Sequence, residues 1–134
     1  MSDWPIPNPI DPINAEFWQV CQEGALRVQR CTSCGKFRHL PRYMCAECGS
    51  TEYEWAPVTQ QGKLYSWTVT HQVFHTQFAV PFVAAVVEFP EGVRLMSHLV
   101  DAEPGQLEIG LPVRVDFHRV SDDFQTPVFR LGSD

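Results

Sequence analysis

The chain has 134 residues, of which 44% are hydrophobic, and its formal net charge at pH 7 is -6. This length suits one domain or two small ones, and no apolar run approaches the roughly 20 residues that a membrane-spanning helix requires. The acidic balance argues against general nucleic-acid binding, for which a basic domain is typical.

Residues 1–30 are predicted to form a proline-rich arm followed by a helix. The arm, residues 4–12, contains four prolines, which remove backbone donors and favour an extended, polyproline-like segment. Its Trp4, Ile6 and Ile10, with Ile13 just after it, are apolar side chains that a groove on another protein could bury. We therefore expect the arm to help dock the chain onto a partner.

The helix is predicted to run through residues 15–22, with Asn14 as its N-cap and Gly24 at its end. Helical spacing places an aromatic face on one side, which indicates packing inside the chain or against another subunit. This face consists of Phe17, Trp18 and Cys21. Cys21 lies outside the cysteine motifs described next and is expected to be a small buried hydrophobe.

Residues 31–55 are predicted to form a rubredoxin-like zinc ribbon, because the motif Cys-x-x-Cys-Gly occurs twice with a ten-residue spacer between the pairs. Two intervening residues let both thiolates of a pair point at one ion. The glycine that follows lets the backbone turn back at positive φ. The candidate metal ligands are Cys31, Cys34, Cys45 and Cys48.

Other uses of four cysteines must be weighed. Disulfides are typical of secreted chains, but residues 1–5 are polar and contain a proline, unlike a secretory signal. A redox pair would favour one Cys-x-x-Cys motif beside a βαβ unit. Iron in a rubredoxin-type site would use the same four thiolates, so the ligands alone do not exclude it. Reduced cysteines predict a cytoplasmic protein.

Half of the ten basic residues lie between positions 27 and 42, where there is no Asp or Glu. These cations can offset the formal charge of -2 that four thiolates leave around one divalent ion. They can also form an anion site for phosphates, and the two interpretations are compatible. The five residues are Arg27, Arg30, Lys36, Arg38 and Arg42.

After residue 55 the apolar pattern changes to a period of two, which is typical of half-buried strands. Five short strands separated by turn residues predict a small closed or partly open β-barrel over residues 56–134. The segment 100–111, which contains a proline and two glycines, is expected to connect two strands. The expected strands are residues 63–71, 82–89, 93–99, 113–118 and 127–131.

No convincing catalytic group emerges from the sequence. Ser66 and Ser97 lie in predicted strands without the sharp turn that exposes a nucleophile. His71 and His75 are four residues apart, but a helix is needed to place both on one metal, and this region is predicted as strand and loop. His71 instead shares a strand face with Trp67, which favours packing or the lining of a groove.

The order of these motifs resembles the family of zinc-ribbon plus OB-fold proteins associated with acyl-CoA metabolism. The resemblance extends from Phe17 to Leu131. It rests on the helix, both Cys-x-x-Cys-Gly motifs with Pro41-Arg42 between them, the strand sequence Gly-Lys-Leu-Tyr-Ser-Trp-Thr-Val at 62–69, and Glu-Ile-Gly-Leu-Pro-Val at 108–113. It implies that the barrel is an OB fold.

The resemblance also implies a non-catalytic accessory subunit. Such proteins accompany thiolase-like enzymes, including sterol-carrier-type thiolases and aldolases, or hot-dog-fold enoyl-CoA hydratases, and can help form the acyl-CoA site. On this basis we expect Arg38 or Arg42 to hold coenzyme A phosphates in the assembled complex. The alternative is a single-stranded nucleic-acid-binding module that stacks bases on Tyr65, Trp67 and Phe82.

Overall fold

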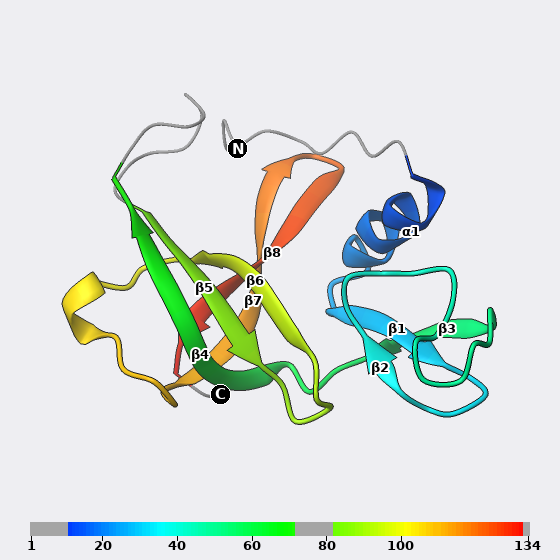
Figure 1. Cartoon of the computed structure of the whole chain (residues 1–134). Coiled ribbons are helices and arrows are strands. Elements are labelled where there is room, and N and C mark those ends of the chain that lie inside the picture. Colours follow the sequence, from blue (N-terminus) through cyan, green and yellow to red (C-terminus); the bar gives the residue numbers. More distant parts are fainter. Residues whose placement is uncertain (1–10, 72–81, 133–134) are drawn as a thin grey trace.

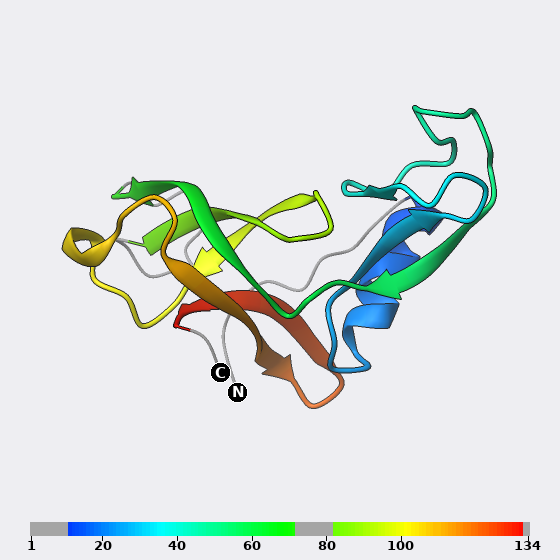
Figure 2. The same cartoon turned by 90° about the horizontal axis from the view of Figure 1, so that it is seen from below.

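The structure, a computed structural model, describes residues 11–71 and 82–132. It confirms a mainly β fold in which a helix and a small three-stranded sheet lie beside a closed five-stranded barrel (Figures 1 and 2). No helix within these two ranges is long and apolar enough to cross a membrane. The elements are α1 (Pro12–Cys21), β1 (Arg27–Cys31), β2 (Phe37–Arg38), β3 (Tyr53–Pro57), β4 (Gln61–Thr70), β5 (Phe82–Glu88), β6 (Arg94–Leu99), the 3-10 helix η1 (Pro104–Gln106), β7 (Pro112–Ser121) and β8 (Phe124–Leu131).

Helix α1 begins earlier than the sequence predicts. The side chain of Asp11 caps it by accepting a hydrogen bond from the backbone N–H of Ile13 at 3.0 Å. Pro12 occupies the first helical position, where its fixed φ suits the helix and no N–H is needed. The predicted cap at Asn14 is therefore wrong, because Pro12 starts the helix and does not end the arm. Residues 1–10, the rest of the arm, lie outside the described residues.

The apolar face of α1 packs within the chain. Ile13, Phe17 and Cys21, spaced by four residues, are buried. The expectation that Ile13 anchors a partner is therefore wrong, because its side chain is already buried within this chain. Trp18 is half-buried and its ring lies 5.8 Å from that of Phe124 in β8, measured between centroids. The expectation that this face serves packing is confirmed for these residues.

The barrel closes in the order β4-β5-β6-β8-β7, with β6 and β8 parallel and the other neighbours antiparallel. Strand β5 sends Val83, Ala85 and Val87 into the core. Strand β4 pairs first with β7 and then with β5, so it bends around the barrel. Gly62 permits this bend, because a Cβ there would lie 2.6 Å from the backbone oxygen of Glu88.

Two glutamine side chains join the helix and ribbon to the barrel, and each of them both donates and accepts a hydrogen bond. The Gln22 amide donates to the carbonyl oxygen of Gln125 at 3.0 Å and accepts from the backbone N–H of the same residue at 2.7 Å. The Gln60 side chain accepts from the N–H of Leu26 at 2.9 Å and donates to its carbonyl oxygen at 3.1 Å. Figure 2 shows the short connection from β3 to β4 that also links the two parts.

Candidate functional site

The four predicted ligand cysteines converge. Their Sγ atoms all lie within 4.8 Å of one another, with 3.6 Å between Cys31 and Cys48 and 3.7 Å between Cys34 and Cys45. Four sulfurs at about 2.3 Å from a tetrahedral zinc ion are about 3.8 Å apart, so this set fits one zinc ion. The cysteines are not joined as disulfides, which would bring two sulfurs to about 2.05 Å.

Two equivalent backbone turns build this cluster. Gly35 has φ of 80° and Gly49 has φ of 76°, the left-handed conformation that glycine adopts without strain. The N–H of Gly35 donates to the carbonyl oxygen of Cys31 at 2.8 Å, and that of Gly49 donates to Cys45 at 2.9 Å. The predicted role of the glycine after each cysteine pair is confirmed.

The surroundings of the four cysteines shift the pKa values of their thiols in opposite directions. Backbone N–H groups, foremost that of Cys34, lower the pKa of Cys31 to about 6, and the N–H of Cys48 leads the lowering of the pKa of Cys45. For Cys48 the N–H of Ser50 acts to lower the pKa, but contacts with neighbouring sulfurs and desolvation outweigh it and raise the value to about 12. Full ionisation therefore requires a positive ion among the sulfurs.

Two of the five cations noted in the sequence are paired with acids. Arg30 forms an ion pair with Glu54 at 3.4 Å, and Lys36 forms one with Glu47 at 3.1 Å. The Nε of Arg30 also donates to the carbonyl oxygen of Gly35 at 3.3 Å, in the first cysteine turn. These two cations are thus balanced by acids beside the cysteine cluster.

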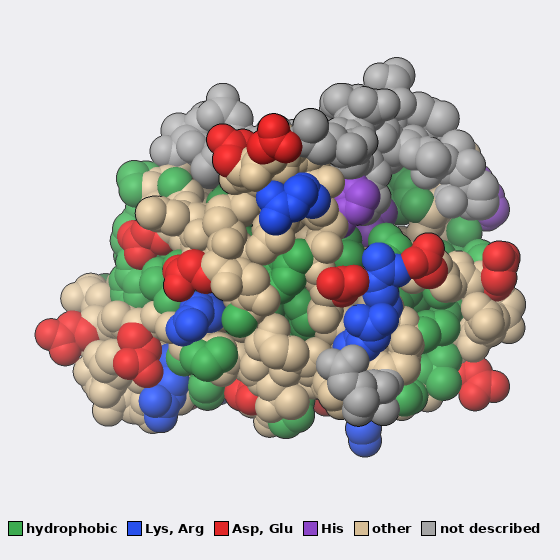
Figure 3. Space-filling view, turned by 180° about the vertical axis from the view of Figure 1, so that it is seen from behind, with side chains coloured by type: hydrophobic (Ala, Val, Ile, Leu, Met, Phe, Trp, Pro, Cys, Tyr) green, Lys and Arg blue, Asp and Glu red, His purple; other side chains and the backbone are tan. Residues whose placement is uncertain are grey.

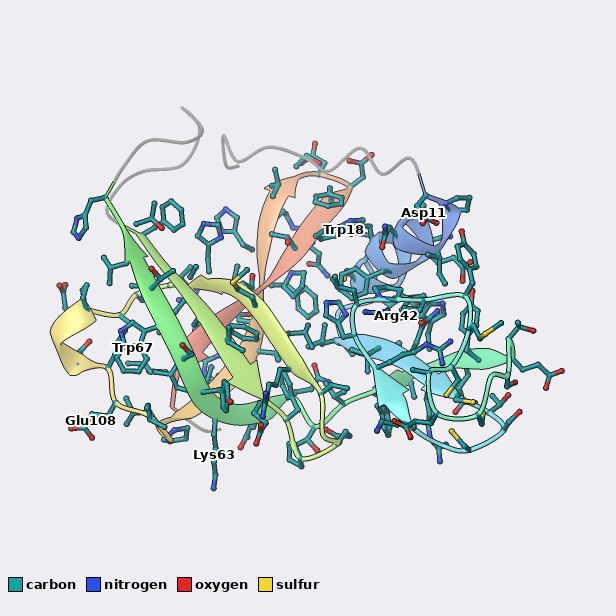
Figure 4. All side chains as sticks on the ribbon, in the orientation of Figure 1. Asp11, Trp18, Arg42, Lys63, Trp67 and Glu108 are labelled. Carbon is teal, nitrogen blue, oxygen red and sulfur yellow. The ribbon has the colours of Figure 1, made fainter. Side chains whose placement is uncertain are left out.

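The two predicted phosphate ligands differ in availability. Arg38 donates from Nε to the side-chain oxygen of Gln29 at 2.8 Å and from Nη2 to the carbonyl oxygen of Arg42 at 3.0 Å. The Arg42 guanidinium is exposed and makes no hydrogen bond or ion pair with the described residues. Figure 4 places Arg42 in the ribbon and Lys63 on the barrel. Arg42 is therefore free to meet an external anion.

Two polar side chains that the sequence did not single out fix the ribbon. Gln29 is fully buried, and its side-chain oxygen also accepts the backbone N–H of Arg42 at 2.7 Å. Glu16 of α1 accepts hydrogen bonds from the Tyr53 hydroxyl and the Trp55 indole, each at 3.0 Å. Burial and the bond to Glu16 raise the pKa of Tyr53. No local sequence signal marks either side chain, because their partners are distant in the chain.

A groove of about 220 Å³ lies between α1, the segment after β2, and the barrel strands β6 and β8. Leu40 and Met96 line it and remain 67% and 68% exposed. His39 also lines it, and burial lowers the pKa of this histidine to about 4, so its ring is neutral at pH 7. The lining residues are Asn14, Phe17, Trp18, His39, Leu40, Pro41, Leu95, Met96, Ser97, Thr126, Pro127 and Phe129.

Comparison with known proteins identifies two matching domains. Residues 18–54 match the rubredoxin-like zinc ribbon domain of ChsH2, and residues 55–118 match its C-terminal OB-fold domain. A solved structure of the Ltp2-ChsH2(DUF35) aldolase is similar, with a TM-score of 0.87 and 35% identity. The match covers 93% of this chain and 98% of that one.

Two curated proteins are also similar in sequence to this chain. The chain is 37% identical over 117 residues to a probable enoyl-CoA hydratase alpha subunit of Thermomonospora curvata, covering 87% of this chain but only 37% of that protein. It is 33% identical over 107 residues to a DUF35 domain-containing scaffold protein of Methanocaldococcus jannaschii, covering 77% and 74% of the two. The chain therefore belongs to the ChsH2/DUF35 family, whose zinc-ribbon and OB-fold proteins are associated with thiolase-like, aldolase and hydratase acyl-CoA enzymes.

Proposed function

We propose that this chain is an accessory, non-catalytic subunit that assembles with an acyl-CoA enzyme of the aldolase, thiolase-like or hydratase type and helps form its acyl-CoA site. The observation that carries the proposal is the likeness, over 93% of the chain, to a chain of the Ltp2-ChsH2(DUF35) aldolase. The hydratase alpha subunit adds support, because a matching region there forms just over a third of an acyl-CoA enzyme subunit.

Zinc in this subunit is proposed to be structural. The ligands would be Cys31, Cys34, Cys45 and Cys48, whose sulfurs fit one ion. Four thiolates complete a tetrahedral shell, so a zinc ion bound there supplies a cross-link within the ribbon and leaves no open position for a substrate.

The described residues offer little for covalent catalysis. The Cys21 thiol is fully buried, and burial raises its pKa to about 12, so the reactive thiolate is scarce at neutral pH. The Ser97 hydroxyl donates a hydrogen bond to the carbonyl oxygen of Pro127 at 2.7 Å, which is no general base. These contacts support a subunit that contributes binding surface and leaves the chemistry to its partner.

Arg42 is proposed to contact a coenzyme A phosphate in the complex, with Arg38 holding the segment that presents it. An Arg42→Ala complex is expected to bind acyl-CoA roughly ten- to hundredfold more weakly, since a charge-assisted hydrogen bond contributes about 1.5 to 3 kcal/mol. Titration calorimetry on the assembled complex measures this, with zinc content as a check on folding. Lys63→Ala, which removes an exposed cation from strand β4 of the barrel, is the matched control.

Parent-like affinity in both the Arg38→Ala and Arg42→Ala complexes would mean that the phosphates are held elsewhere. Weaker binding in the Lys63→Ala complex as well would indicate a general effect of net charge. A loss of acyl-CoA affinity in the Arg42→Ala complex alone would show that Arg42 binds the phosphate and that Arg38 serves only the ribbon.

A nucleic-acid-binding role has weaker support. Cations and acids are interleaved on the face shown in Figure 3, and they form no continuous basic groove there. The Arg94 guanidinium lies over the ring of Tyr65 at 3.9 Å and pairs with Glu88 at 2.8 Å, so one face of this aromatic ring is already occupied.

Co-expression with an aldolase or thiolase-like subunit tests the proposed function. We expect a stable complex on size-exclusion chromatography, confirmed by mass spectrometry, and no acyl-CoA turnover by the isolated chain. Turnover by the isolated chain would contradict the accessory role. Failure to form a complex with any such subunit would contradict the assembly.

A further inference from the structure

The groove beside the ribbon has the properties of a protein-docking site. Its two rims come from different parts of the fold, Leu40 from the segment after β2 and Met96 from β6, and each side chain is about two-thirds exposed. Large exposed apolar side chains that face one hollow are typical of interaction surfaces. The described part of the chain has only six exposed large hydrophobic residues, and two of them line this groove.

The size and charge of the groove indicate what it accepts. A volume of about 220 Å³ lies below the roughly 300 to 1,000 Å³ of sites that enclose a drug-sized ligand. Its lining contains no Lys, Arg, Asp or Glu, and His39 is neutral at pH 7. A charged or phosphorylated group would lose hydration there without compensation. The groove thus suits an uncharged apolar side chain that projects from a larger surface.

The wall that carries Leu40 is held in place before any partner binds. Gln29 binds the Arg38 side chain and the Arg42 backbone N–H, so both ends of the segment 38–42 are anchored to one buried amide. Arg38 also bonds to the carbonyl oxygen of Arg42 at 3.0 Å. A preorganised wall lowers the entropy cost of association.

We propose that this groove is the docking site for an apolar anchor side chain of the acyl-CoA enzyme subunit. The inference rests on the proposed function and adds the surface through which assembly occurs. Position favours this occupant, because the free guanidinium of Arg42 follows the lining residue Pro41 directly in sequence. A subunit seated in the groove would bring its substrate beside the cation proposed to hold the coenzyme A phosphate.

The test compares three full-length chains that each carry one new aspartate at an exposed apolar position. Leu40→Asp and Met96→Asp place a charge on the two rims, and Ile109→Asp places one at a 78% exposed position that does not line the groove. The probe is the Ltp2 aldolase subunit. We expect the rim variants to lose at least tenfold in affinity and the Ile109→Asp chain to stay within about twofold of the parent, with zinc content equal in all.

Each outcome decides the matter. Parent-like binding by both rim variants would overturn the docking site and leave the proposed function standing. Failure of the parent chain to form a complex with Ltp2 and with every other aldolase, thiolase-like or hydratase subunit tried would overturn both. A parent dimer that the rim variants dissociate while enzyme binding persists would assign the groove to a second copy of the chain. Tighter enzyme binding after deletion of residues 1–10 would assign it to the chain's own N-terminal segment, and would equally overturn the proposal.

Discussion

A Cys45→Ser variant is expected to lose its zinc and the fold of the ribbon, while the parent chain holds one equivalent. Zinc binding to structural sites of this kind contributes about 10 to 16 kcal/mol, as much as the entire stability of a typical domain. The sheet of the ribbon is small, with only two residues in β2, so the ion is the main link between the two cysteine turns. Elemental analysis and limited proteolysis measure the two effects, and elemental analysis also distinguishes zinc from iron.

The fifth cysteine supplies the matched control. Cys21 is fully buried but lies in α1, outside the cluster. A Cys21→Ser chain should keep one equivalent of zinc and lose about 1 to 3 kcal/mol from a buried hydroxyl with an incomplete set of hydrogen bonds. Full zinc content in the Cys45→Ser chain would refute the four-thiolate site.

A Gln29→Leu substitution is expected to lower the free energy of unfolding by about 2 to 4 kcal/mol without removing zinc. It deletes the acceptor for Arg38 Nε and for the backbone N–H of Arg42, and it leaves both donors without this partner. Urea denaturation in zinc-containing buffer measures the loss. The segment 38–42 should also exchange its amide hydrogens faster.

Gln19 provides the comparison, because it is an exposed glutamine on α1. Gln19→Leu should change stability by less than about 0.5 kcal/mol. If Gln29→Leu is equally harmless, the buried amide does not hold the segment and Leu40 is not preorganised by it.

The metal ligands and the barrel strands are predictable from sequence because their signals are local. Two residues between cysteines and a glycine after them define one turn of backbone, as the φ values of Gly35 and Gly49 show. The apolar run of β5 and the turn residues on either side of it are likewise a signal within one strand and its neighbouring turns. The helix start at Pro12 had a local signal too, since a proline after Asp11 is typical of a capped first turn.

The groove and the buried amide could not be predicted in this way. The groove combines side chains from four segments that are distant in sequence, so no window of residues contains its pattern. Gln29 lies next to Val28, and both are fully buried, so β1 is covered on both faces at this point. A polar residue in a short strand otherwise predicts exposure, and only the tertiary contacts with Arg38 and Arg42 reverse that expectation.

The paired glutamine bonds at Gln22–Gln125 and Gln60–Leu26 have a mechanical consequence. Each pair of hydrogen bonds opposes sliding of the helix and ribbon against the barrel, because one bond of the pair runs in each direction. The ribbon and the barrel are therefore held together as one unit and are not two domains joined only by a linker. An enzyme subunit bound at the ribbon would therefore keep a fixed orientation relative to any molecule that contacts the barrel.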